Sequence, residues 1–327
     1  MNNLKVRHVP VLVNEVLSGL NVNLAPLKSQ EIVDTKKYID ATVGAGGHTI
    51  EIVKRGGRVL GIDADPKMIE VARENLEFAL RAGMPSGLDT CPTDNPDGCY
   101  TLICGNFREI YSIAQERGFN EVEGILFDLG ISSLHYGFPR GFSFKNPDAP
   151  LDMRFNDQKQ GVTAAMLLSA LGIHDLEKMF AEVMPVYLSR KISVSIIEER
   201  RSKKIETVGD FIEILDKAGI KRKKSKFIGS ISYSTLPFLA LRLAVNNELE
   251  SISIALPKAF SLLKSGGRMA VISFHSGEDK QVKNYFQTLV SSEKANIIYK
   301  KLIRPAQSEI GSNPRARSAK LRVLEKI

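Results

Sequence analysis

The sequence predicts an α/β protein in which a Rossmann-like parallel sheet is interrupted by an inserted helical domain. Between residues 37 and 128, short apolar segments alternate with helical periodicity, which is typical of parallel strands joined by crossover helices. From residue 133 to residue 236 the alternation stops, and it resumes from residue 237 onward. We therefore expect a sheet domain made of residues 1–132 and 237–327, with residues 133–236 as the helical insert.

Four strands are expected in the first half of the chain. They are apolar runs of about five residues, at residues 37–41, 58–62, 100–104 and 124–128. After the second run, Asp65 can cap a helix that has Pro66 at its first position and stops at Gly83. This helix would be the crossover between the second and third strands.

The insert and the second half of the chain are expected to be mainly helical at first. Helical periodicity marks residues 163–171, 175–182, 190–200 and 208–215 of the insert. A long helix over residues 237–263 then leads to a fifth strand at 268–273 and a helix at 278–289. Two late strand candidates are residues 297–303 and 319–325.

Composition excludes a membrane-spanning protein. Hydrophobic residues make up 43% of the 327-residue chain, yet no segment approaches the roughly 20 uninterrupted apolar residues of a membrane helix. The first eight residues lack a secretory apolar core. We expect a cytoplasmic location.

The charge indicates a polyanionic partner. The formal net charge is +8, and basic residues gather in three clusters. The clusters are Arg200-Arg201-Ser202-Lys203-Lys204, Lys221-Arg222-Lys223-Lys224-Ser225-Lys226, and Arg315, Arg317, Lys320 and Arg322. Any single cluster is equally compatible with a solvated face, and three in one chain favour nucleic acid.

Neither a disulfide nor a metal site is expected. The three cysteines, Cys91, Cys99 and Cys104, have no Cys-x-x-Cys spacing, and the histidines are not spaced as metal ligands. The prediction is therefore a protein without a bound metal.

A glycine loop after the first strand indicates a nucleoside cofactor. The loop Gly44-Ala45-Gly46-Gly47-His48 follows Asp40 and opens a helix, and the second strand ends at Asp63. Asp40 just ahead of the loop, and the lack of a regular Gly-x-Gly-x-x-Gly spacing, favour S-adenosylmethionine over NAD. The remaining alternative is a tight turn that binds no ligand.

Polar side chains at the strand ends are expected to converge on one cleft. Asp63 is the candidate for the ribose hydroxyls, with a helix-capping or surface carboxylate as the alternative. Phe107 follows the third strand, where an adenine ring is usually sandwiched, although ordinary core packing is nearly as plausible. His48 is expected to pack or to form a hydrogen bond near the cofactor.

Asp128, at the end of the fourth strand, is the candidate catalytic residue. A polar group there can accept a hydrogen bond from an exocyclic amine and align its nitrogen with a methyl donor. The alternative is that Asp128 contacts only the cofactor. His275 is the best polar candidate on the substrate side, and His135 could contact either ligand.

Nine peptides, in this order, carry a resemblance to a known family. They are His8-Val9-Pro10-Val11-Leu12, Gly44-Ala45-Gly46-Gly47-His48, Asp63-Ala64-Asp65-Pro66, Asp128-Leu129-Gly130-Ile131-Ser132-Ser133, Arg140-Gly141-Phe142-Ser143-Phe144, Pro150-Leu151-Asp152-Met153-Arg154, Val245-Asn246-Asn247-Glu248-Leu249, Ser273-Phe274-His275-Ser276 and Asn313-Pro314-Arg315-Ala316-Arg317-Ser318. With them, the chain resembles the RsmH (MraW) family over nearly its whole length.

The resemblance implies a class I S-adenosylmethionine-dependent methyltransferase that modifies the N4 amine of a cytosine in small-subunit (16S) ribosomal RNA, near the decoding centre. The partner would be this RNA or the assembling small subunit in bacterial cytoplasm, with an organelle as the alternative. The insert would recognise the substrate. Implied cofactor contacts are Gly46, Gly47, His48, Asp63, Phe107, Asp128 and His135; we assign Asp152, Arg154, His275 and Ser276 to the substrate.

The chain departs from the family pattern at four places. His135 replaces a usual Gln, and Gly277 replaces a Leu. Met184-Pro185-Val186-Tyr187 stands where Gly-Glu-Glu-Arg is expected, and Ser232-Tyr233-Ser234-Thr235-Leu236 replaces His-Pro-Ala-Thr-Arg. These changes fall mainly in the insert and its hinge.

Three other functions remain as alternatives. A methyltransferase for another nucleic-acid amine is one, although Asp128 is followed by Leu129-Gly130 and not by the Pro-Pro-aromatic element of DNA amino-methyltransferases. An NAD-dependent oxidoreductase would need the regular glycine spacing. A non-catalytic ribosome-assembly factor would keep the cofactor pocket only as structure.

Overall fold

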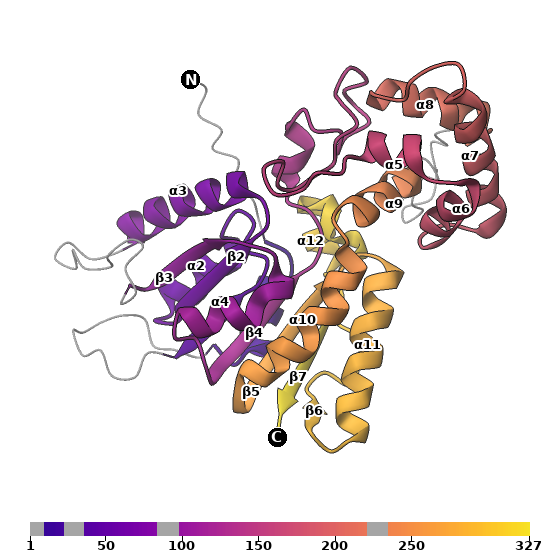
Figure 1. Ribbon diagram of the computed structural model, residues 1–327. Coiled ribbons are helices and arrows are strands. Elements are labelled where there is room, and N and C mark those ends of the chain that lie inside the picture. The colour runs from indigo at the N-terminus through magenta and orange to yellow at the C-terminus, as the bar shows by residue number, and fades with distance from the viewer. Residues whose placement is uncertain (1–9, 23–35, 84–97, 221–234) are drawn as a thin grey trace. The chain divides into compact units, whose positions relative to one another are not determined.

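The computed structural model describes residues 10–22, 36–83, 98–220 and 235–327 of the chain (Figure 1). They form two compact units, one within residues 1–131 and 250–327 and the other within residues 132–249. The predicted insert, residues 133–236, ends earlier than the second unit. Helix α9 (Thr235–Val245) belongs to this unit because its Phe238 packs against Phe211, with ring centroids 5.2 Å apart.

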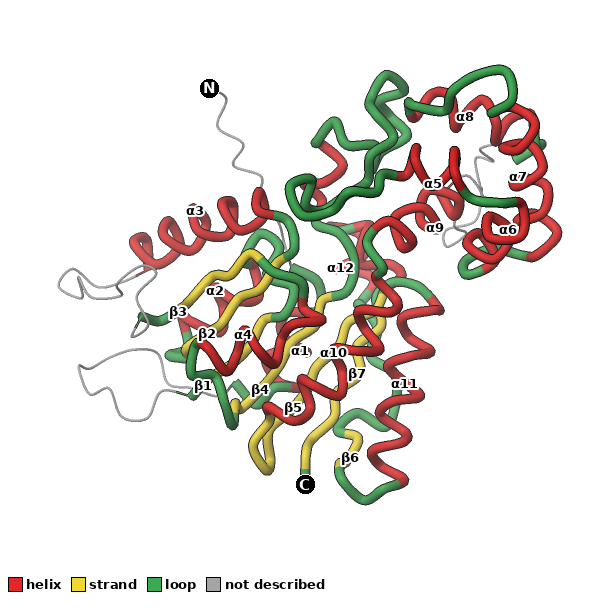
Figure 2. Tube along the Cα trace, in the orientation of Figure 1, coloured by secondary structure: helices red, strands yellow, loops and turns green. Residues whose placement is uncertain are grey.

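The first unit is built on a seven-stranded sheet with the order β3-β2-β1-β4-β5-β7-β6. Neighbours from β3 to β5 pair in parallel, and β7 runs antiparallel to both β5 and β6. The strands, drawn in yellow in Figure 2, are β1 (Lys37–Asp40), β2 (Arg58–Asp63), β3 (Tyr100–Cys104), β4 (Val122–Asp128), β5 (Leu263–Ser273), β6 (Ala295–Ile297) and β7 (Lys320–Lys326).

The strand order determines where a ligand can bind. The chain runs outward from β1 to β2 and β3, then returns to place β4 on the other side of β1. At such a reversal, open parallel sheets bind ligands beyond the carboxyl ends of the two strands, which here are β1 and β4. Asp40 ends β1 and Asp128 ends β4.

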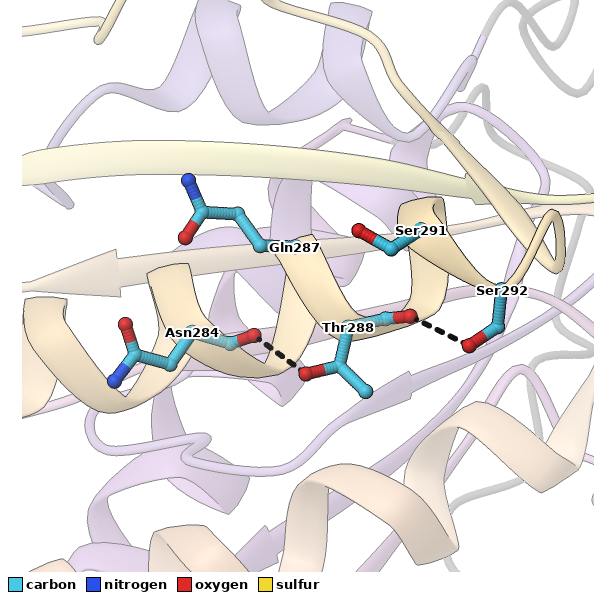
Figure 3. Close-up of a pocket in the computed structure, with 5 residues that line it drawn as sticks. All are labelled: Asn284, Gln287, Thr288, Ser291 and Ser292. Atoms are coloured by element: carbon cyan, nitrogen blue, oxygen red, sulfur yellow. Dashed lines mark hydrogen bonds between the residues drawn. The ribbon is translucent and has the colours of Figure 1, made fainter.

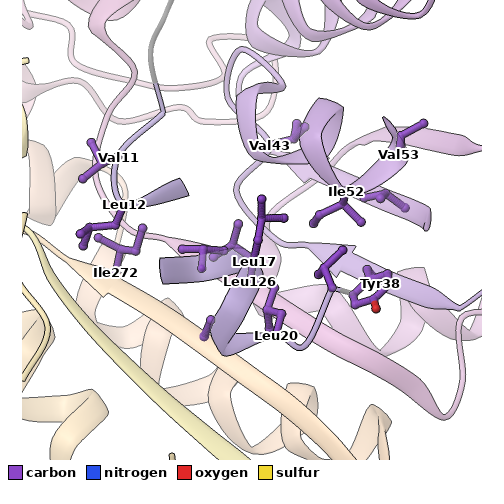
Figure 4. Packing of buried hydrophobic residues seen from close by; sticks show 14 of the residues in the cluster. Val11, Leu12, Leu17, Leu20, Tyr38, Val43, Ile52, Val53, Leu126 and Ile272 are labelled. Carbon is purple, nitrogen blue, oxygen red and sulfur yellow. The ribbon is translucent and has the colours of Figure 1, made fainter. Parts of the chain in front are cut away.

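The core covers both faces of the sheet. One buried cluster takes alternate strand residues, such as Leu126 and Ile272, together with side chains of the N-terminal segment and α1 (Figure 4). Since side chains alternate between faces, the neighbours Ile125, Phe127 and Val271 point to the other face, and they are buried too. Two covered faces are what a doubly wound α/β sheet requires.

Helices of the first unit follow the strands in the predicted alternation. They are α1 (Val13–Gly19), α2 (Gly47–Lys54), α3 (Pro66–Gly83), α4 (Ile110–Glu116), α10 (Glu248–Leu262), α11 (Ser276–Ser291) and α12 (Gln307–Ser312), with short 3-10 turns at Phe107–Glu109 and Pro314–Ser318. The predicted cap of α3 is confirmed, because the Asp65 carboxylate accepts the Lys67 N–H at 3.0 Å.

The second unit is helical in its described part. After a 3-10 turn at Ser133–Gly137 come α5 (Ala164–Ala170), α6 (Ile173–Ala181), α7 (Val186–Glu199), α8 (Val208–Lys217) and α9. Phe180 of α6 stacks on Phe211 of α8 with ring centroids 6.4 Å apart. The Thr207 hydroxyl and the Asp210 carboxylate form a reciprocal cap at the start of α8.

Three predicted elements differ from the structure, and one of them is β5, which begins at Leu263 and not at residue 268. The long helix over residues 237–263 is two helices, α9 and α10, because Asn247 between them has a left-handed backbone with φ of 48°. The late strand at residues 297–303 shrinks to β6, and Ile303 keeps only an isolated bridge to Leu321. Between β6 and Ile303, the Tyr299 hydroxyl donates to the Glu15 carbonyl of α1, and the chain here is not part of a strand.

The expectation of no disulfide is wrong, because Cys99 is disulfide-bonded, whereas Cys104 is a free thiol. Sequence spacing alone carried no signal for this bond. Several predicted features lie outside the described residues: the basic cluster at residues 221–226, Cys91, and residues 232–234 of the hinge.

Candidate active site

Two carboxylates, the buried Asp40 and the partly exposed Asp128, lie at the carboxyl ends of the central strands. Asp40 ends β1, and its side chain accepts hydrogen bonds from the Thr49 hydroxyl at 2.7 Å and the Thr42 N–H at 3.2 Å. Burial raises the pKa of Asp40 to about 6, with a smaller contribution from Asp63 and against the effect of both hydrogen bonds. The two threonines therefore hold the Asp40 carboxylate in place.

Asp128 ends β4 beside Asp40. The Thr42 hydroxyl accepts the Asp128 N–H at 2.6 Å, which ties this strand end to the turn after β1. The side chain is 19% exposed, and its Oδ2 lies 3.7 Å from Nδ1 of His48. Its Oδ1 is buried and has no hydrogen-bond partner among the described residues. A buried acceptor without a partner is costly, so Oδ1 marks a position where a ligand can donate.

The electrostatics of Asp128 match this geometry. Burial is the largest cause that raises the pKa of Asp128, to about 8, and the negative charges of Asp40 and Glu278 add to it. A carboxyl group whose pKa lies near neutral pH can both accept and release a proton under physiological conditions.

The glycine loop is tied to the end of β2 through Asp63. Oδ2 of Asp63 accepts the Gly44 N–H at 2.9 Å, and Oδ1 accepts the Asp65 N–H at 2.9 Å. Gly44 and Gly46 have φ of 51° and 84°, a left-handed conformation that favours glycine, and α2 begins directly afterwards. Asp63 thus orders both loops that border the predicted cofactor site, while its contact with a ribose stays a prediction.

His48 connects α2 to the N-terminal segment. Its Nε2 lies 2.9 Å from the Val11 carbonyl oxygen, and since a carbonyl can only accept, Nε2 carries the proton. A side chain added at Gly47 would come within 2.9 Å of Pro10, so the N-terminal segment lies directly against the start of α2. His48 is thus buried and hydrogen-bonded within the protein, while its place beside the cofactor stays a prediction.

Phe107 lies directly after β3 in the turn capped by Asn106. Its ring meets that of Phe127 edge to face at 5.8 Å, and the side chain is half-buried. The packing role predicted as one alternative is therefore present. The proposed adenine contact stays a prediction, because a half-buried ring also keeps exposed surface.

The turn after β5 is organised by Glu278. Its Oε2 accepts the N–H groups of Phe274 and His275 at 2.8 and 3.2 Å, and its Oε1 lies 3.1 Å from Nε2 of His275. Glu278 is 1% exposed, and Ser276 is exposed at the first position of α11. The imidazole of His275 is thus used in capping α11, which the sequence did not predict.

The other predicted site residues belong to the second unit. His135 is buried among Phe138, Phe142 and Phe155, whose ring centroids lie 5.3 to 6.2 Å from its own. Its Nδ1 lies 3.3 Å from the Ser132 carbonyl. An aromatic cage of this kind holds the ring in one orientation.

Asp152 and Arg154 bind each other. Nε and Nη2 of Arg154 donate to the two carboxylate oxygens at 2.8 and 2.7 Å, and Nη1 donates to the carbonyls of Asp157 and Gln160. The paired guanidinium lowers the pKa of Asp152 despite partial burial. The predicted substrate role of this pair stays a prediction, since most of its hydrogen-bonding capacity is used within the loop.

Sequence reasoning missed the residue that holds this loop. The Asn246 amide donates to the Met153 and Arg242 carbonyls, and its oxygen accepts the Phe155 N–H at 3.0 Å. The available signal was its place within the peptide Val245-Asn246-Asn247-Glu248-Leu249. The pattern could not reveal that a residue about 90 positions away depends on it.

The basic clusters are only partly available to a polyanion. Arg200 donates to the carbonyls of Leu168 and Leu171, and Lys203 pairs with Asp210. Asp279 pairs with both Lys320 and Arg322, which lowers its pKa despite partial burial. Arg201, Lys204, Arg315 and Arg317 of the two described clusters are exposed.

A polar hollow lies on α11, away from these strand ends. It is lined by Asn284, Gln287, Thr288, Ser291 and Ser292 (Figure 3). The hydroxyls of Thr288 and Ser292 bond to carbonyls of their own helix, so they do not point to a ligand. Thr288 is roughly 18 Å along the helix from its first residue.

Two further findings concern the class of protein. Among the described residues, no three or more His, Cys, Asp or Glu side chains are grouped to hold a metal ion. None of the helices within the described ranges is long and apolar enough to cross a membrane.

The strand order with an antiparallel β7, the glycine loop and the polar strand ends together define a class I S-adenosylmethionine-dependent methyltransferase. A model of the MraW methylase family matches residues 5–327, and the chain belongs to this family.

Named relatives match this chain over nearly their full length. A protein of Dictyoglomus thermophilum, named ribosomal RNA small subunit methyltransferase H, is 36% identical over 98% of this chain and 96% of its own. A Bacteroides fragilis protein of the same name is 35% identical over 98% of this chain and 97% of its own length. A solved rRNA methylase of Streptococcus thermophilus is 12% identical over 98% of both chains, with a TM-score of 0.44, too low to establish a shared fold.

The residues present fit the methyl donor of this class. Oδ1 of Asp128, which has no hydrogen-bond partner within the described ranges, and the left-handed Gly44 and Gly46 lie at the carboxyl ends of the adjacent strands β4 and β1. Glycines permit a ligand to approach the backbone closely, and the carboxylates of Asp40 and Asp128 favour a positively charged group nearby. S-adenosylmethionine carries such a positive charge.

Proposed function

We propose that this protein transfers a methyl group from S-adenosylmethionine to the exocyclic N4 amine of a cytosine in small-subunit (16S) ribosomal RNA, near the decoding centre. The observation that carries the proposal is Oδ1 of Asp128, a buried acceptor at the end of β4 that no described group satisfies. The printed names of the relatives supply the class of substrate.

The cofactor would be held from three sides in this proposal. Asp63, which accepts the N–H groups of Gly44 and Asp65, would also accept hydrogen bonds from the ribose hydroxyls. The backbone of Gly46 and Gly47, with His48, would border the methionine part, and Phe107 would contact the adenine. His135, caged by aromatic rings of the second unit, is proposed as a further cofactor contact on the family resemblance.

Asp128 would act on the amine. When bound, the cofactor supplies a methyl group on a positively charged sulfur, which is already a strong electrophile. The N4 lone pair of cytosine is delocalised into the ring, so an acceptor aimed at one N–H keeps the nitrogen in line with the methyl carbon. The target base would have to leave its stack to reach this position.

Asp128 would also accept the proton that the amine loses. Methyl transfer would form a bond from the nitrogen to the methyl carbon and break the carbon–sulfur bond, whose electron pair would stay on sulfur. The methylated nitrogen would then release one proton. The carboxylate of Asp128 would take that proton, which its pKa of about 8 allows near neutral pH. Asp40 would stay fixed by Thr49 and support the strand end.

The second unit would recognise the RNA. The net charge of +8 and the exposed Arg201 and Lys204 support contact with phosphates. His275 and Ser276 are proposed to contact the substrate at the sheet, and Asp152 and Arg154 to do so in the second unit. The partner would be this RNA alone or the assembling small subunit.

The test is mass spectrometry of nucleosides from small-subunit rRNA incubated with the protein and isotope-labelled S-adenosylmethionine. Labelled N4-methylcytidine is the expected product. A labelled methyl group on adenosine, or on DNA, would replace the proposal with another nucleic-acid amine. Cofactor binding without any transfer to RNA or assembled particles would favour a ribosome-assembly factor.

A further inference from the structure

A chain of contacts leads from both ends of the protein to Asp128. In α12, Oε1 of Glu309 accepts the Leu12 N–H at 2.8 Å. The preceding carbonyl, that of Val11, accepts the Nε2 proton of His48 at 2.9 Å. On the other side of the same ring, Nδ1 lies 3.7 Å from Oδ2 of Asp128. All five residues belong to the unit that contains the sheet.

Leu12 has a backbone conformation that must be held in place. Its φ is 54° and its ψ is 37°, in the left-handed region that a leucine rarely adopts. Its side chain is 1% exposed in the core beside Val11, so the residue cannot move alone. Strained conformations persist when their surroundings over-determine them, and here Glu309 supplies the acceptor for the Leu12 N–H.

The orientation of Leu12 sets the direction of the Val11 carbonyl, because both belong to one peptide unit. That carbonyl in turn selects the His48 tautomer with the proton on Nε2, which leaves a lone pair on Nδ1. Nδ1 is the atom that faces Asp128.

We propose that Glu309 is a positioning residue for methyl transfer: by holding Leu12, it keeps the Val11 carbonyl on Nε2 of His48, so that Nδ1 orients the carboxyl group of Asp128. This inference rests on the proposed function, because Asp128 is the group that is positioned. It adds a residue from the C-terminal end of the chain to the reaction.

The consequence for Asp128 is that its two carboxyl oxygens have different roles. When Asp128 is protonated, a proton on Oδ2 faces the lone pair of Nδ1, and this directs Oδ1 at the substrate amine. Once that proton has left, the carboxylate is the form that takes the proton of the amine. The groups that act on Asp128 from the neighbouring elements are Asp40 of β1, Glu278 of α11 and His48 of α2. Two of them are carboxylates that repel its charge, so His48 is the neighbour able to orient it.

Five variants separate positioning from simple attachment of the chain ends. Glu309→Ala removes the acceptor, and Glu309→Gln keeps an oxygen at the same distance. His48→Gln keeps a donor for the Val11 carbonyl but has no Nδ1, and it is combined with Glu309→Ala in a double variant. Glu325→Ala is the matched control, because Glu325 pairs with Arg268 at the opposite edge of the sheet.

The first measurement needs no substrate. Nitrogen-15 NMR of the five histidines reports which ring nitrogen of His48 carries its proton in the free protein. We expect the Nε2–H form in the wild type and in Glu309→Gln, and a mixture of both forms in Glu309→Ala. A wild-type spectrum for Glu309→Ala would overturn the proposal, whatever the RNA assay gives.

The second measurement is the single-turnover transfer rate to rRNA as a function of pH. We expect Glu309→Ala to lower the rate roughly 10- to 100-fold, the cost of a small misplacement of a reacting group. The apparent pKa of the rate should also fall, because protonated Asp128 loses the acceptor at Nδ1. Cofactor affinity should change less than about threefold.

Rescue and coupling complete the test. Glu309→Gln should restore most of the rate, and Glu325→Ala should leave both the rate and its pH profile at wild-type values. The double variant should be no slower than His48→Gln, because both changes interrupt one path. If the rate losses of His48→Gln and Glu309→Ala multiply in the double variant, Glu309 is only a structural contact. The same holds if Glu309→Ala lowers the rate without changing its pH profile. If the wild type transfers no methyl group, the proposed function fails, while the NMR result still decides the contact path.

Discussion

Asp128→Asn should stabilise the free protein, and the gain should grow with pH. The folded protein raises the pKa of Asp128 to about 8 from an ordinary value of 3.8, because burial and two nearby carboxylates oppose its charge. Stability from the protonated form is fully present below pH 3.8 and is lost progressively as pH rises towards 8. Asparagine never ionises, so the variant escapes this loss.

The magnitude follows from the span of the shift. The rise of the Asp128 pKa from 3.8 to about 8 would lower the free energy of unfolding by roughly 5–6 kcal/mol at pH 8 if the side chain were sealed from water. Asp128 is 19% exposed, so water screens part of the penalty. We therefore expect a gain of about 1–3 kcal/mol at pH 8 and little difference at pH 4. For a domain of this size the melting temperature should rise by roughly 2–10 °C at pH 8.

Scanning calorimetry of the free protein between pH 4 and pH 8 measures this difference. Asp152→Asn is the matched control with the opposite sign, because pairing with Arg154 lowers the pKa of Asp152. That variant should lose stability above the ordinary carboxyl pKa, and the loss should shrink as the pH falls. An Asp128→Asn variant that is less stable than wild type at pH 8, or whose gain is the same at every pH, would refute the electrostatic account.

Four further expectations concern activity, binding and folding. Asp128→Asn should slow single-turnover transfer with saturating cofactor roughly 100- to 10,000-fold and change cofactor affinity less than about tenfold; near-wild-type transfer would leave Asp128 as a cofactor contact only. Asp63→Ala should weaken S-adenosylmethionine binding by roughly 10- to 200-fold in calorimetry, without any NAD binding, and an unchanged affinity would contradict the ribose assignment. Reversing residues 221–224 to Glu should weaken RNA binding and flatten its salt dependence by roughly 0.7–0.9 in log–log slope per lost contact; an indifferent affinity would make the cluster a solvated face. Asn246→Ala should cost about 2–4 kcal/mol in denaturant unfolding because buried partners lose their bonds, while exposed Asn284→Ala should be nearly neutral; equal effects would remove the proposed role of Asn246.

The sequence was sufficient where structure depends on local pattern. β1 to β4 lie at or within two residues of the predicted runs, because apolar runs bounded by glycine or a carboxylate set both backbone conformation and burial. The glycine loop and Asp63 could be located in the same way, since a parallel sheet presents the carboxyl ends of its strands at one edge. The cap of α3 by Asp65 followed from the dipeptide alone.

Tertiary structure decided what those side chains do. Thr42 and Thr49 hold the carboxylate of Asp40, and the Thr42 hydroxyl also accepts the Asp128 N–H from 86 positions away. Glu278 organises the turn after β5 and Arg154 is occupied by Asp152, and the sequence analysis predicted neither pairing. The raised pKa of Asp128 depends on burial and on charges from other elements, which exist only once the strands are adjacent. The contact between Leu12 and Glu309 joins residues 297 positions apart. Local sequence fixes conformation and periodicity, but the neighbours of a buried group, and hence its charge and its free acceptors, are fixed by non-local packing.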